Sequence, residues 1–448
     1  MSRSSGPKIV IVGGGSNAWT PQIVRDILLT PSLARSHIVL HDIRKKASDL
    51  NKAFLDLLQP RLGSQATIVS TNQQARAFDK ADYFIITIST GGLDAMAHDL
   101  AIPQRYGIYQ TVGDSTGPGG WARFIRNFDV FADMAKAINR YAPGAMVLNY
   151  TNPMATLTDV LARLCQGPVV GLCHGLFENI DFLQRYYRLK SEHELSLRYG
   201  GLNHFFWITH ARARQKDVLA DLAQRLKRQS FTDLLRDSSP DPMGFKSNRE
   251  VATELFRLTG VLPYLGDRHT CEFVPWYLND KGALGRYKII RTTVAQRRTA
   301  FRQRHRQLER MVRTGKIPAF YERRSRETAA DIIDAHSQGK TFIDVGNTPN
   351  TGQIENLPRG VVVETAVRVD ATGLTPLAFG PLPRQVLGLV EPHAHAYQMV
   401  VDACMTGDRQ LALQALRLDP LSSRLDGQKL TRMGQELLGA HKRFITAF

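Results

Sequence analysis

The most constraining feature of this chain is a glycine-rich turn that follows a short apolar run near the N-terminus. Residues 8–12 read KIVIV and are followed by GGGSNA, in which Gly13, Gly15 and Ala18 fit the pattern G-x-G-x-x-A and Ser16 lies within the turn. Such glycines allow a tight strand-to-helix turn and let a pyrophosphate approach the helix N-terminus. The pattern therefore predicts a Rossmann-like fold that binds a dinucleotide.

Two further loops support this interpretation. The second apolar run, residues 37–42, ends in Asp42, and an acid at this place hydrogen-bonds the ribose hydroxyls and disfavours a 2′-phosphate. A third run, residues 83–89, is followed by Thr90 and two glycines, at a strand end where ligands approach such sheets. We therefore expect NAD rather than NADP, bound by Gly13, Gly15, Ser16, Asp42 and Thr90.

The order of apolar runs predicts the architecture. Alternating short runs and helical patterns in the first third are typical of a doubly wound parallel sheet. The expected strands are 8–13, 37–42, 66–70, 83–89, 146–149 and 169–173, and the expected helices are 16–29, 48–58 and 124–142. The alternation fades after about residue 175, although 201–209 and 361–369 still predict strands and the end is mostly helical. We expect an α/β protein with a Rossmann-like NAD-binding domain over 1–170 and an α+β catalytic and substrate-binding domain over 171–448.

Composition narrows the possible partners and compartment. The formal net charge is +17, but no zinc-finger spacing, basic zipper or RNP-type motif accompanies the arginine-rich stretch at 297–313. That stretch predicts a polar, solvated helix, so we expect no nucleic-acid partner; a basic surface would instead attract small acidic substrates. The sequence contains neither a signal segment nor a run of about 18 apolar residues, so we expect no association with a membrane. With four widely spaced cysteines, the chain is predicted to be cytoplasmic with reduced thiols.

A second chemical signal lies further along the chain. Cys173 and His174 directly follow the apolar residues 169–172, and His204 lies in the motif GLNH. Cysteine and histidine favour a borderline divalent ion and can leave positions open for substrate oxygens. The alternative is a buried cysteine and a core histidine without a metal. We interpret a further pair, His393 and His395, as surface histidines.

Together these residues resemble the family 4 glycoside hydrolases. The matching motifs occur in family order over nearly the whole chain: GGGS at 13–16, Asp42, NYTNP at 149–153, Cys173-His174 and GLNH at 201–204. Motifs at 105–114, 117–120, 266–269 and 347–358 are closest to the α-galacturonidase branch. The glycine after His174 instead recurs in an α-glucosidase branch, so α-glucuronides and neutral α-glucosides or α-galactosides remain alternatives to α-galacturonides. Cys-His rather than Cys-Asp or Cys-Asn argues against a 6-phosphosugar.

The resemblance implies a redox-neutral elimination, an exception to two-carboxylate glycosidases. NAD⁺ takes hydride from C3 of the sugar, which acidifies the C2 proton. A divalent metal, expected to be Mn²⁺ and held by Cys173 and His204, stabilises the resulting enediolate. A base removes the C2 proton, the aglycone leaves from C1, water adds, and the hydride returns.

The resemblance also implies roles for individual residues. Asp267 is predicted to be the base, with His269 and Tyr264 as alternatives, although an ion pair with a neighbouring arginine would give Asp267 a structural role. His174 is predicted to be an acid or hydrogen-bond donor near the leaving oxygen. Arg268 is predicted to bind a substrate carboxylate.

The remaining expectations concern substrate contacts, assembly and competing functions. Asn152 and His269 are predicted to contact the sugar, a uronide derived from pectin. The resemblance implies a homodimer or homotetramer. A metal-independent, NAD-dependent 2-hydroxyacid dehydrogenase is the competing enzyme, and a non-catalytic NAD-sensing protein is the competing binding function.

Overall fold

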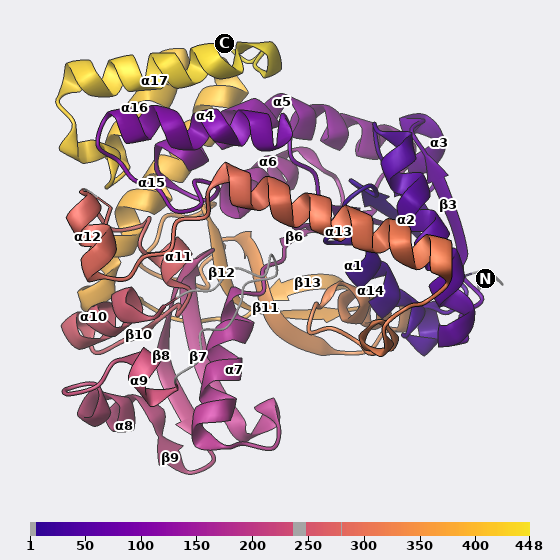
Figure 1. Ribbon diagram of the computed structural model, residues 1–448, viewed down its shortest axis with the longest axis horizontal. Coiled ribbons are helices and arrows are strands. Elements are labelled where there is room, and N and C mark those ends of the chain that lie inside the picture. The colour runs from indigo at the N-terminus through magenta and orange to yellow at the C-terminus, as the bar shows by residue number, and fades with distance from the viewer. Residues whose placement is uncertain (1–5, 236–247, 279) are drawn as a thin grey trace.

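The chain folds around one mixed β-sheet, seen in the computed structural model that describes residues 6–235, 248–278 and 280–448 (Figure 1). The strand order is β10-β8-β7-β12-β11-β6-β5-β4-β1-β2-β3. One half is parallel: β3 (Thr67–Thr71), β2 (His37–His41), β1 (Lys8–Val12), β4 (Tyr83–Ile86), β5 (Met146–Asn149) and β6 (Val169–Gly171).

The other half of the sheet is antiparallel. It contains β11 (Phe342–Pro349), β12 (Val362–Asp370), β7 (Leu195–Leu202), β8 (Phe205–Ala213) and β10 (Leu262–Pro263), with β13 (Gly373–Pro376) beside β12 and β9 (Lys216–Asp217) beside β8. The halves meet where β11 pairs with β6 through Asn347 and Gly171. The sheet therefore continues through the predicted division at residue 170, which stays a prediction.

Helices cover both faces of the parallel half. Side chains alternate along β1, so Ile9 and Ile11 pack against one helical layer and Val10 and Val12 against the other. The first layer contains α1 (Thr20–Leu28), α2 (Lys45–Leu58), α13 (Val294–Thr314) and α14 (Ala329–Gln338); the second contains α5 (Gly117–Tyr141), α6 (Met154–Leu164), α15 (Arg384–Thr406), α16 (Arg409–Leu418) and α17 (Gly427–His441). This arrangement confirms the predicted doubly wound fold.

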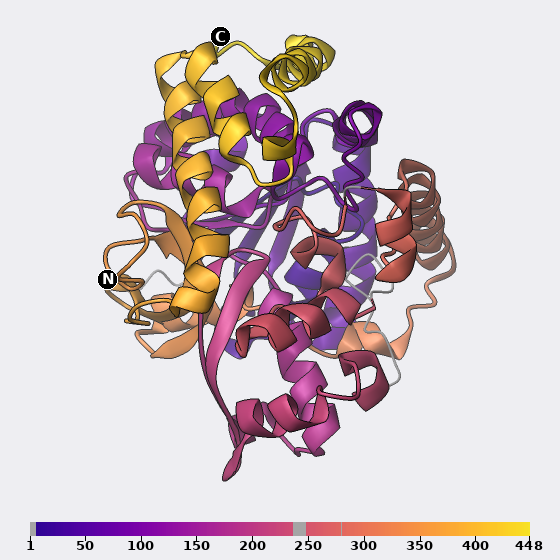
Figure 2. The ribbon, with the colours of Figure 1, turned by 90° about the vertical axis from the view of Figure 1, so that its left-hand side faces the viewer.

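The remaining helices connect these layers and surround the antiparallel half. They are α3 (Gln74–Phe78), α4 (Gly92–Arg105), α7 (Gly175–Tyr187), α8 (Val218–Arg225), α9 (Phe231–Leu234), α10 (Glu250–Thr259), α11 (Asp267–Thr270) and α12 (Lys281–Arg286). Helices α15–α17 lie at one end of the molecule, and the β7–β8 hairpin extends toward the other (Figures 1 and 2).

Three local predictions need correction or comment. The single strand predicted at 201–209 is wrong, because the chain turns between β7 and β8 and His204 takes a positive φ of 63°. Helix α1 begins at Thr20 rather than Ser16, since residues 13–19 form turns. The arginine-rich stretch forms the polar helix that we predicted, with only Arg297, Leu308 and Met311 buried. No helix among the described residues is long and apolar enough to cross a membrane.

Candidate active site

The glycine turn after β1 is shaped by close backbone contacts. Gly13 has a φ of 93°, and a Cβ atom there would lie 2.7 Å from the Thr87 carbonyl oxygen. The Gly15 N–H donates to Asp42 Oδ2 at 2.9 Å, while Oδ1 accepts the Arg44 N–H at 2.8 Å. Asp42 therefore orders this turn as well as the start of the next loop. Its contact with a ribose stays a prediction.

Two other predicted loops lie at the same edge of the sheet. The Thr90 N–H donates to Asn127 Oδ1 at 3.1 Å, and the Thr90 carbonyl accepts Arg126 Nε at 3.0 Å. Asn152 follows β5, and its buried side-chain oxygen has no hydrogen-bond partner within the described residues. The carboxyl ends of β1, β4 and β5 thus bring the predicted cofactor and substrate loops together.

Cys173 and His204 meet across the seam of the sheet. Cys173 follows β6, and His204 lies in the turn between β7 and β8. Cys173 Sγ lies 3.2 Å from His204 Nε2, and the Gly175 N–H points at the same sulfur at 3.4 Å. Both side chains are buried. The structure therefore brings together the two residues predicted to bind a metal, although they are 31 positions apart.

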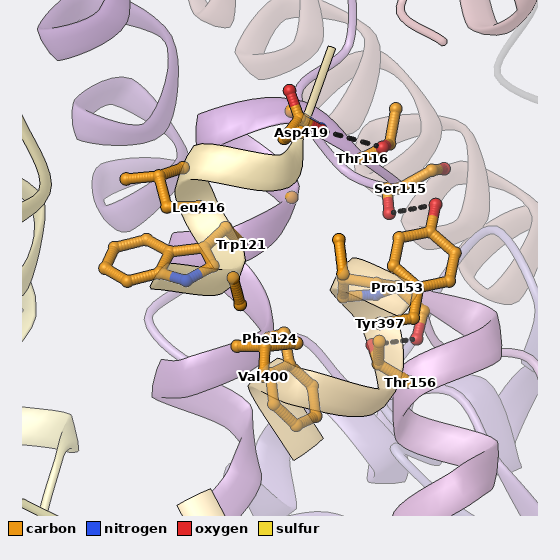
Figure 3. A pocket seen from close by; sticks show the side chains of 14 residues that line it. Ser115, Thr116, Trp121, Phe124, Pro153, Thr156, Tyr397, Val400, Leu416 and Asp419 are labelled. Atoms are coloured by element: carbon orange, nitrogen blue, oxygen red, sulfur yellow. Dashed lines mark hydrogen bonds between the residues drawn. The ribbon is translucent and has the colours of Figure 1, made fainter. Parts of the chain in front are cut away.

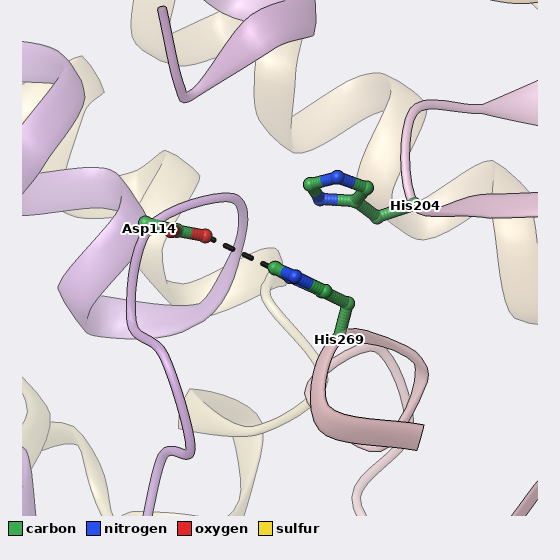
Figure 4. Close-up of side chains that lie close together, drawn as sticks. All are labelled: Asp114, His204 and His269. Atoms are coloured by element: carbon green, nitrogen blue, oxygen red, sulfur yellow. Dashed lines mark ion pairs between the residues drawn. The ribbon is translucent and has the colours of Figure 1, made fainter. Parts of the chain in front are cut away.

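Two more donors complete this cluster (Figure 4). The rings of His204 and His269 have centroids 4.0 Å apart, and His269 Nδ1 lies 3.8 Å from Asp114 Oδ1. One ligand atom each of Asp114, His204 and His269 all lie within 4.8 Å of one another. Sequence reasoning missed Asp114 as a site residue, because it lies in the loop between α4 and α5 and follows no strand.

The electrostatics of the cluster suit a metal ion. Burial lowers the pKa of His204 to about 4 and moves that of His269 well below its usual value, so both imidazoles are neutral and keep a lone pair. Burial opposes ionisation of Asp114, yet the positive charges of Arg123 and Arg297 help to outweigh it and hold its pKa below the usual range. Burial raises the pKa of the Cys173 thiol, which metal binding would deprotonate.

A buried carboxylate positions the loop that carries Asp114. Glu272 Oε1 accepts the N–H groups of Thr111, Val112 and Gly113 at 2.6, 2.8 and 3.0 Å. Ser115, just beyond this loop, lies 2.8 Å from His204 Nδ1 through its Oγ. Glu272 thus holds the loop, and Ser115 orients the His204 ring through its Nδ1.

A second buried carboxylate supports the hairpin turn. Glu364 Oε2 accepts the side-chain N–H groups of Asn203 and Asn347, both at 3.0 Å. Burial raises the pKa of Glu364 to about 7 despite these two bonds. Because Asn203 precedes His204, the carboxylate helps to fix the turn that presents the imidazole.

Asp267 lies at the start of α11 but serves another helix. Its Oδ2 and Oδ1 accept the N–H groups of Val251 and Ala252, each at 2.9 Å, in the first turn of α10. Burial raises its pKa and these two amides lower it, with burial dominating. Both oxygens are occupied and the residue is 2% exposed, so Asp267 holds the start of α10, and its role as the base stays a prediction.

The other predicted residues lie nearer to the cluster. Tyr264 stacks on His204 with a centroid distance of 5.9 Å. His174 follows Cys173, and its Nδ1 lies 3.9 Å from Glu327 Oε1. Burial raises the pKa of Glu327 to about 7. Arg268 is 3% exposed, and Thr111 Oγ1 donates to its carbonyl.

The pair His393 and His395 does not behave as we predicted. His395 has a half-exposed side chain, but His393 is fully buried, with Nε2 2.7 Å from the Phe273 carbonyl. The i, i+2 spacing on α15 places the two rings on different faces of the helix. His393 is therefore a core residue, contrary to the predicted surface position.

A small cavity adjoins the site beside Ser115 (Figure 3). It lies between α5, α15 and α16, and apolar side chains such as Trp121, Phe124 and Leu416 line much of it. Tyr397 closes one side by donating its hydroxyl to the Ser115 carbonyl at 3.4 Å. Its volume is about 20 Å³, which is room for about one water molecule. The cavity therefore does not accommodate a sugar.

Comparison with known proteins assigns the family. Residues 8–188 match the model of "Family 4 glycosyl hydrolase", and residues 199–422 match the "Family 4 glycosyl hydrolase C-terminal domain". The chain belongs to glycosyl hydrolase family 4. The resemblance predicted from the sequence is thereby confirmed, and the chain is an enzyme of the class that acts on O-glycosidic bonds.

Relatives within the family differ in their substrates. The α-galacturonidase of Bacillus subtilis strain 168 is 33% identical over 92% of this chain and 93% of its own length. The α-galacturonidase of Thermoanaerobacterium saccharolyticum is 31% identical, over 98% of this chain and 96% of its own length. An α-galactosidase of Bacillus subtilis is 29% identical, over 97% and 98% respectively.

Solved structures agree with the fold. The Bacillus subtilis protein lplD superposes with a TM-score of 0.87 at 30% identity, covering 97% of this chain and 100% of the other. A 6-phospho-β-glucosidase of Thermotoga maritima, solved with manganese, NAD⁺ and glucose-6-phosphate, has a TM-score of 0.77 at 22% identity, covering 98% of this chain and 99% of the other. The fold of this chain is therefore that of family 4 enzymes.

Proposed function

We propose that this chain hydrolyses α-galacturonides, using NAD and a divalent metal, expected to be Mn²⁺, in a redox-neutral elimination. One observation carries the proposal: Cys173 Sγ and His204 Nε2 lie 3.2 Å apart, beside the loops at the carboxyl ends of β1, β4 and β5. A simple dehydrogenase does not need a cysteine and a histidine placed to bind a metal beside its dinucleotide-binding turn. The full-length α-galacturonidase relatives support the choice of sugar.

The residues present fit both cofactors. Thiol, imidazole and carboxylate donors suit Mn²⁺ or a similar borderline ion. No side chain caps the start of α1 and no acid lies in its first turn, which leaves that helix N-terminus available to a phosphate. When bound, the metal would polarise sugar oxygens and NAD⁺ would accept and return hydride at C3.

The chain's own side chains would divide the remaining work. Cys173 and His204 hold the metal, and Asp114 offers a third ligand from the opposite loop. Asn152 directs its unpartnered side-chain oxygen to a sugar hydroxyl. His174 donates a hydrogen bond to the leaving oxygen, and Glu327 Oε1 lies 3.9 Å from its Nδ1.

The geometry favours a different residue as the base from the one that the sequence suggested. Both oxygens of Asp267 are engaged by the start of α10. His269, an alternative base in the sequence interpretation, lies beside the His204 ring and is itself neutral. We therefore assign removal of the C2 proton to His269. The cytoplasmic location and a dimeric or tetrameric assembly stay predictions.

The decisive experiment is hydrolysis of p-nitrophenyl α-D-galacturonide with NAD⁺, Mn²⁺ and thiol, each omitted in turn. The α-glucuronide and α-galactoside are assayed beside it. We expect activity on the galacturonide that disappears without NAD⁺ or Mn²⁺, with no net NADH. Activity on another glycoside alone would move the specificity. Metal-independent NADH production without hydrolysis would instead favour the dehydrogenase.

A further inference from the structure

Arg123 is a charged residue at the site that neither the motifs nor the roles above explain. It lies in the second turn of α5 and is partly buried. Its Nε donates to the Asn152 carbonyl at 2.9 Å, and its Nη2 donates to Ser89 Oγ at 3.4 Å. These acceptors lie on the loops that follow β5 and β4, so the guanidinium is fixed at the carboxyl edge of the sheet.

Both partners of Arg123 are neutral. Within the described part of the chain, no carboxylate oxygen lies within 4.0 Å of its guanidinium. Arg126, one turn further along α5, shows the opposite situation, because its Nη1 and Nη2 lie 2.8 and 2.7 Å from the two oxygens of Asp99. Arg126 is held in a buried ion pair, whereas Arg123 forms no direct ion pair with a described residue.

A partly buried guanidinium that lacks a direct ion pair favours an anionic ligand. Removing a charge from water is costly unless an opposite charge replaces the lost hydration. The two hydrogen bonds of Arg123 leave N–H groups on both Nη atoms, the geometry that receives a carboxylate in a two-pronged fashion.

We propose that Arg123 binds the carboxylate of the uronide substrate and so determines its selectivity over neutral glycosides. The unpartnered side-chain oxygen of Asn152 belongs to the residue whose carbonyl anchors Arg123, so one loop places a hydroxyl acceptor beside the carboxylate receptor. Arg268, which the sequence favoured for this role, is 3% exposed. The inference rests on the proposed function, because it requires an acidic sugar.

The test compares a charged and a neutral ligand of nearly equal shape. Dissociation constants for galacturonate and its methyl ester are measured on the NAD⁺- and Mn²⁺-loaded enzyme, beside kcat/KM for the p-nitrophenyl α-galacturonide and α-galactoside. We expect Arg123→Met to weaken galacturonate binding about 10- to 100-fold, the range of charge-assisted hydrogen bonds. Methyl ester binding and galactoside turnover should change less than about 3-fold.

Matched variants separate charge recognition from other roles. Arg123→Lys keeps the charge without the fork and should recover part of the galacturonate affinity. Arg268→Met tests the rival residue, and Arg302→Met, on the exposed side of α13, serves as the inert control. Neither should change the preference for acid over ester.

Several results would contradict the inference. Equal losses for acid and ester would mean that Arg123 only supports the loops. A charge-selective loss in Arg268→Met alone would return the role to Arg268. A raised dissociation constant for NAD⁺, measured by fluorescence titration, with unchanged galacturonate binding would assign the anion to the cofactor phosphates. A wild-type enzyme that cleaves galactosides but not galacturonides would instead contradict the proposed function itself.

Discussion

The parallel and antiparallel halves of the sheet contribute to the site in different ways. In the parallel half, the glycine turn, Thr90, Asn152 and Cys173 lie in the loops that follow β1, β4, β5 and β6. Parallel strands all end at one edge, so position in the sequence alone brings these loops together. The antiparallel half has no such common edge, and its contribution, His204, lies in a hairpin turn with a φ of 63°.

The difference shows where a functional residue needs support. A residue after a parallel strand is placed by the sheet itself, but His204 depends on side chains from elsewhere. Ser115 contacts one nitrogen of its ring, and Glu364 fixes the preceding Asn203. A positive φ is strained for a residue with a Cβ atom and persists only when its surroundings fix it. The site therefore combines residues that the parallel strands place by themselves with a histidine that other side chains must hold in position.

The largest expected effect comes from replacing either of the two proposed metal ligands, Cys173 in the parallel half or His204 in the antiparallel half. We expect Cys173→Ala and His204→Ala each to abolish Mn²⁺ binding and lower kcat/KM more than about 100-fold, since even outer-shell partners of metals cost about 10- to 100-fold. Mn²⁺ binding is followed by electron paramagnetic resonance titration. Cys165→Ala, a cysteine at the end of α6, is the control. Full Mn²⁺ affinity in either variant would contradict the proposal that the two halves of the sheet share one metal site.

The support given by Glu272 should produce the next largest effect. In Glu272→Gln, one oxygen can still accept amides from residues 111–113, but the new NH₂ group faces the N–H of Gly113 and the Gln110 amide, which now contact Oε2 at 3.2 Å. We expect Mn²⁺ affinity and kcat to fall about 10-fold. The exposed Glu309→Gln on α13 is the control. A lower melting temperature with unchanged Mn²⁺ affinity would limit Glu272 to folding.

The same contrast explains what the sequence could predict. Local patterns and motifs in the sequence are enough to predict the parallel strands and the glycine turn. They also predict that Cys173 pairs with the GLNH motif. The hairpin at His204 was hidden, because apolar residues run on both sides of one polar pair. Strand β11 was not predicted, since its inner residues include Gly346 and Asn347 rather than an apolar run.

Asp114 and Asp267 show the limit of motif reasoning most clearly. Both lie in motifs of the α-galacturonidase type, and an aspartate in such a motif has no local feature that tells a ligand from a helix-capping group. The difference arises from contacts: Asp114 faces His269, whereas Asp267 accepts amides of α10 from 15 and 16 positions away. Such pairings depend on tertiary structure, which one sequence does not display.

The support of the hairpin by Glu364 predicts a pH-dependent stability. Its pKa is about 7 in the folded chain against 4.5 ordinarily, so the unfolded chain loses the proton first as pH rises. Between about pH 4.5 and 7 this lowers the free energy of unfolding by up to about 3 kcal/mol. Glu364→Gln, which keeps an acceptor for both asparagines, should flatten that slope. Urea unfolding of the metal-free enzyme at several pH values measures it.

Two comparisons make the Glu364 experiment specific. Glu272 and Glu327 also have pKa values raised to about 7, so the informative quantity is the difference between wild type and variant rather than the slope itself. Glu355→Gln, at an exposed position after β11, should leave the slope unchanged. Parallel curves for the wild type and Glu364→Gln would mean that the carboxylate is ionised throughout this range.

The smallest effect on catalysis is expected at Asp267, although a motif singled it out as the base. In Asp267→Asn one oxygen still accepts an amide of α10, while the new NH₂ group faces the other. The free energy of unfolding should fall by about 1–3 kcal/mol, the cost of a buried donor left unsatisfied, and kcat in the folded enzyme should stay within about 3-fold. Asp217→Asn, at the N-cap of α8, is a control because asparagine caps nearly as well as aspartate. A loss of kcat beyond about 100-fold with unchanged stability would restore Asp267 as the base, and would show that the loops outside the parallel half place catalytic groups by a geometry that only a bound sugar completes.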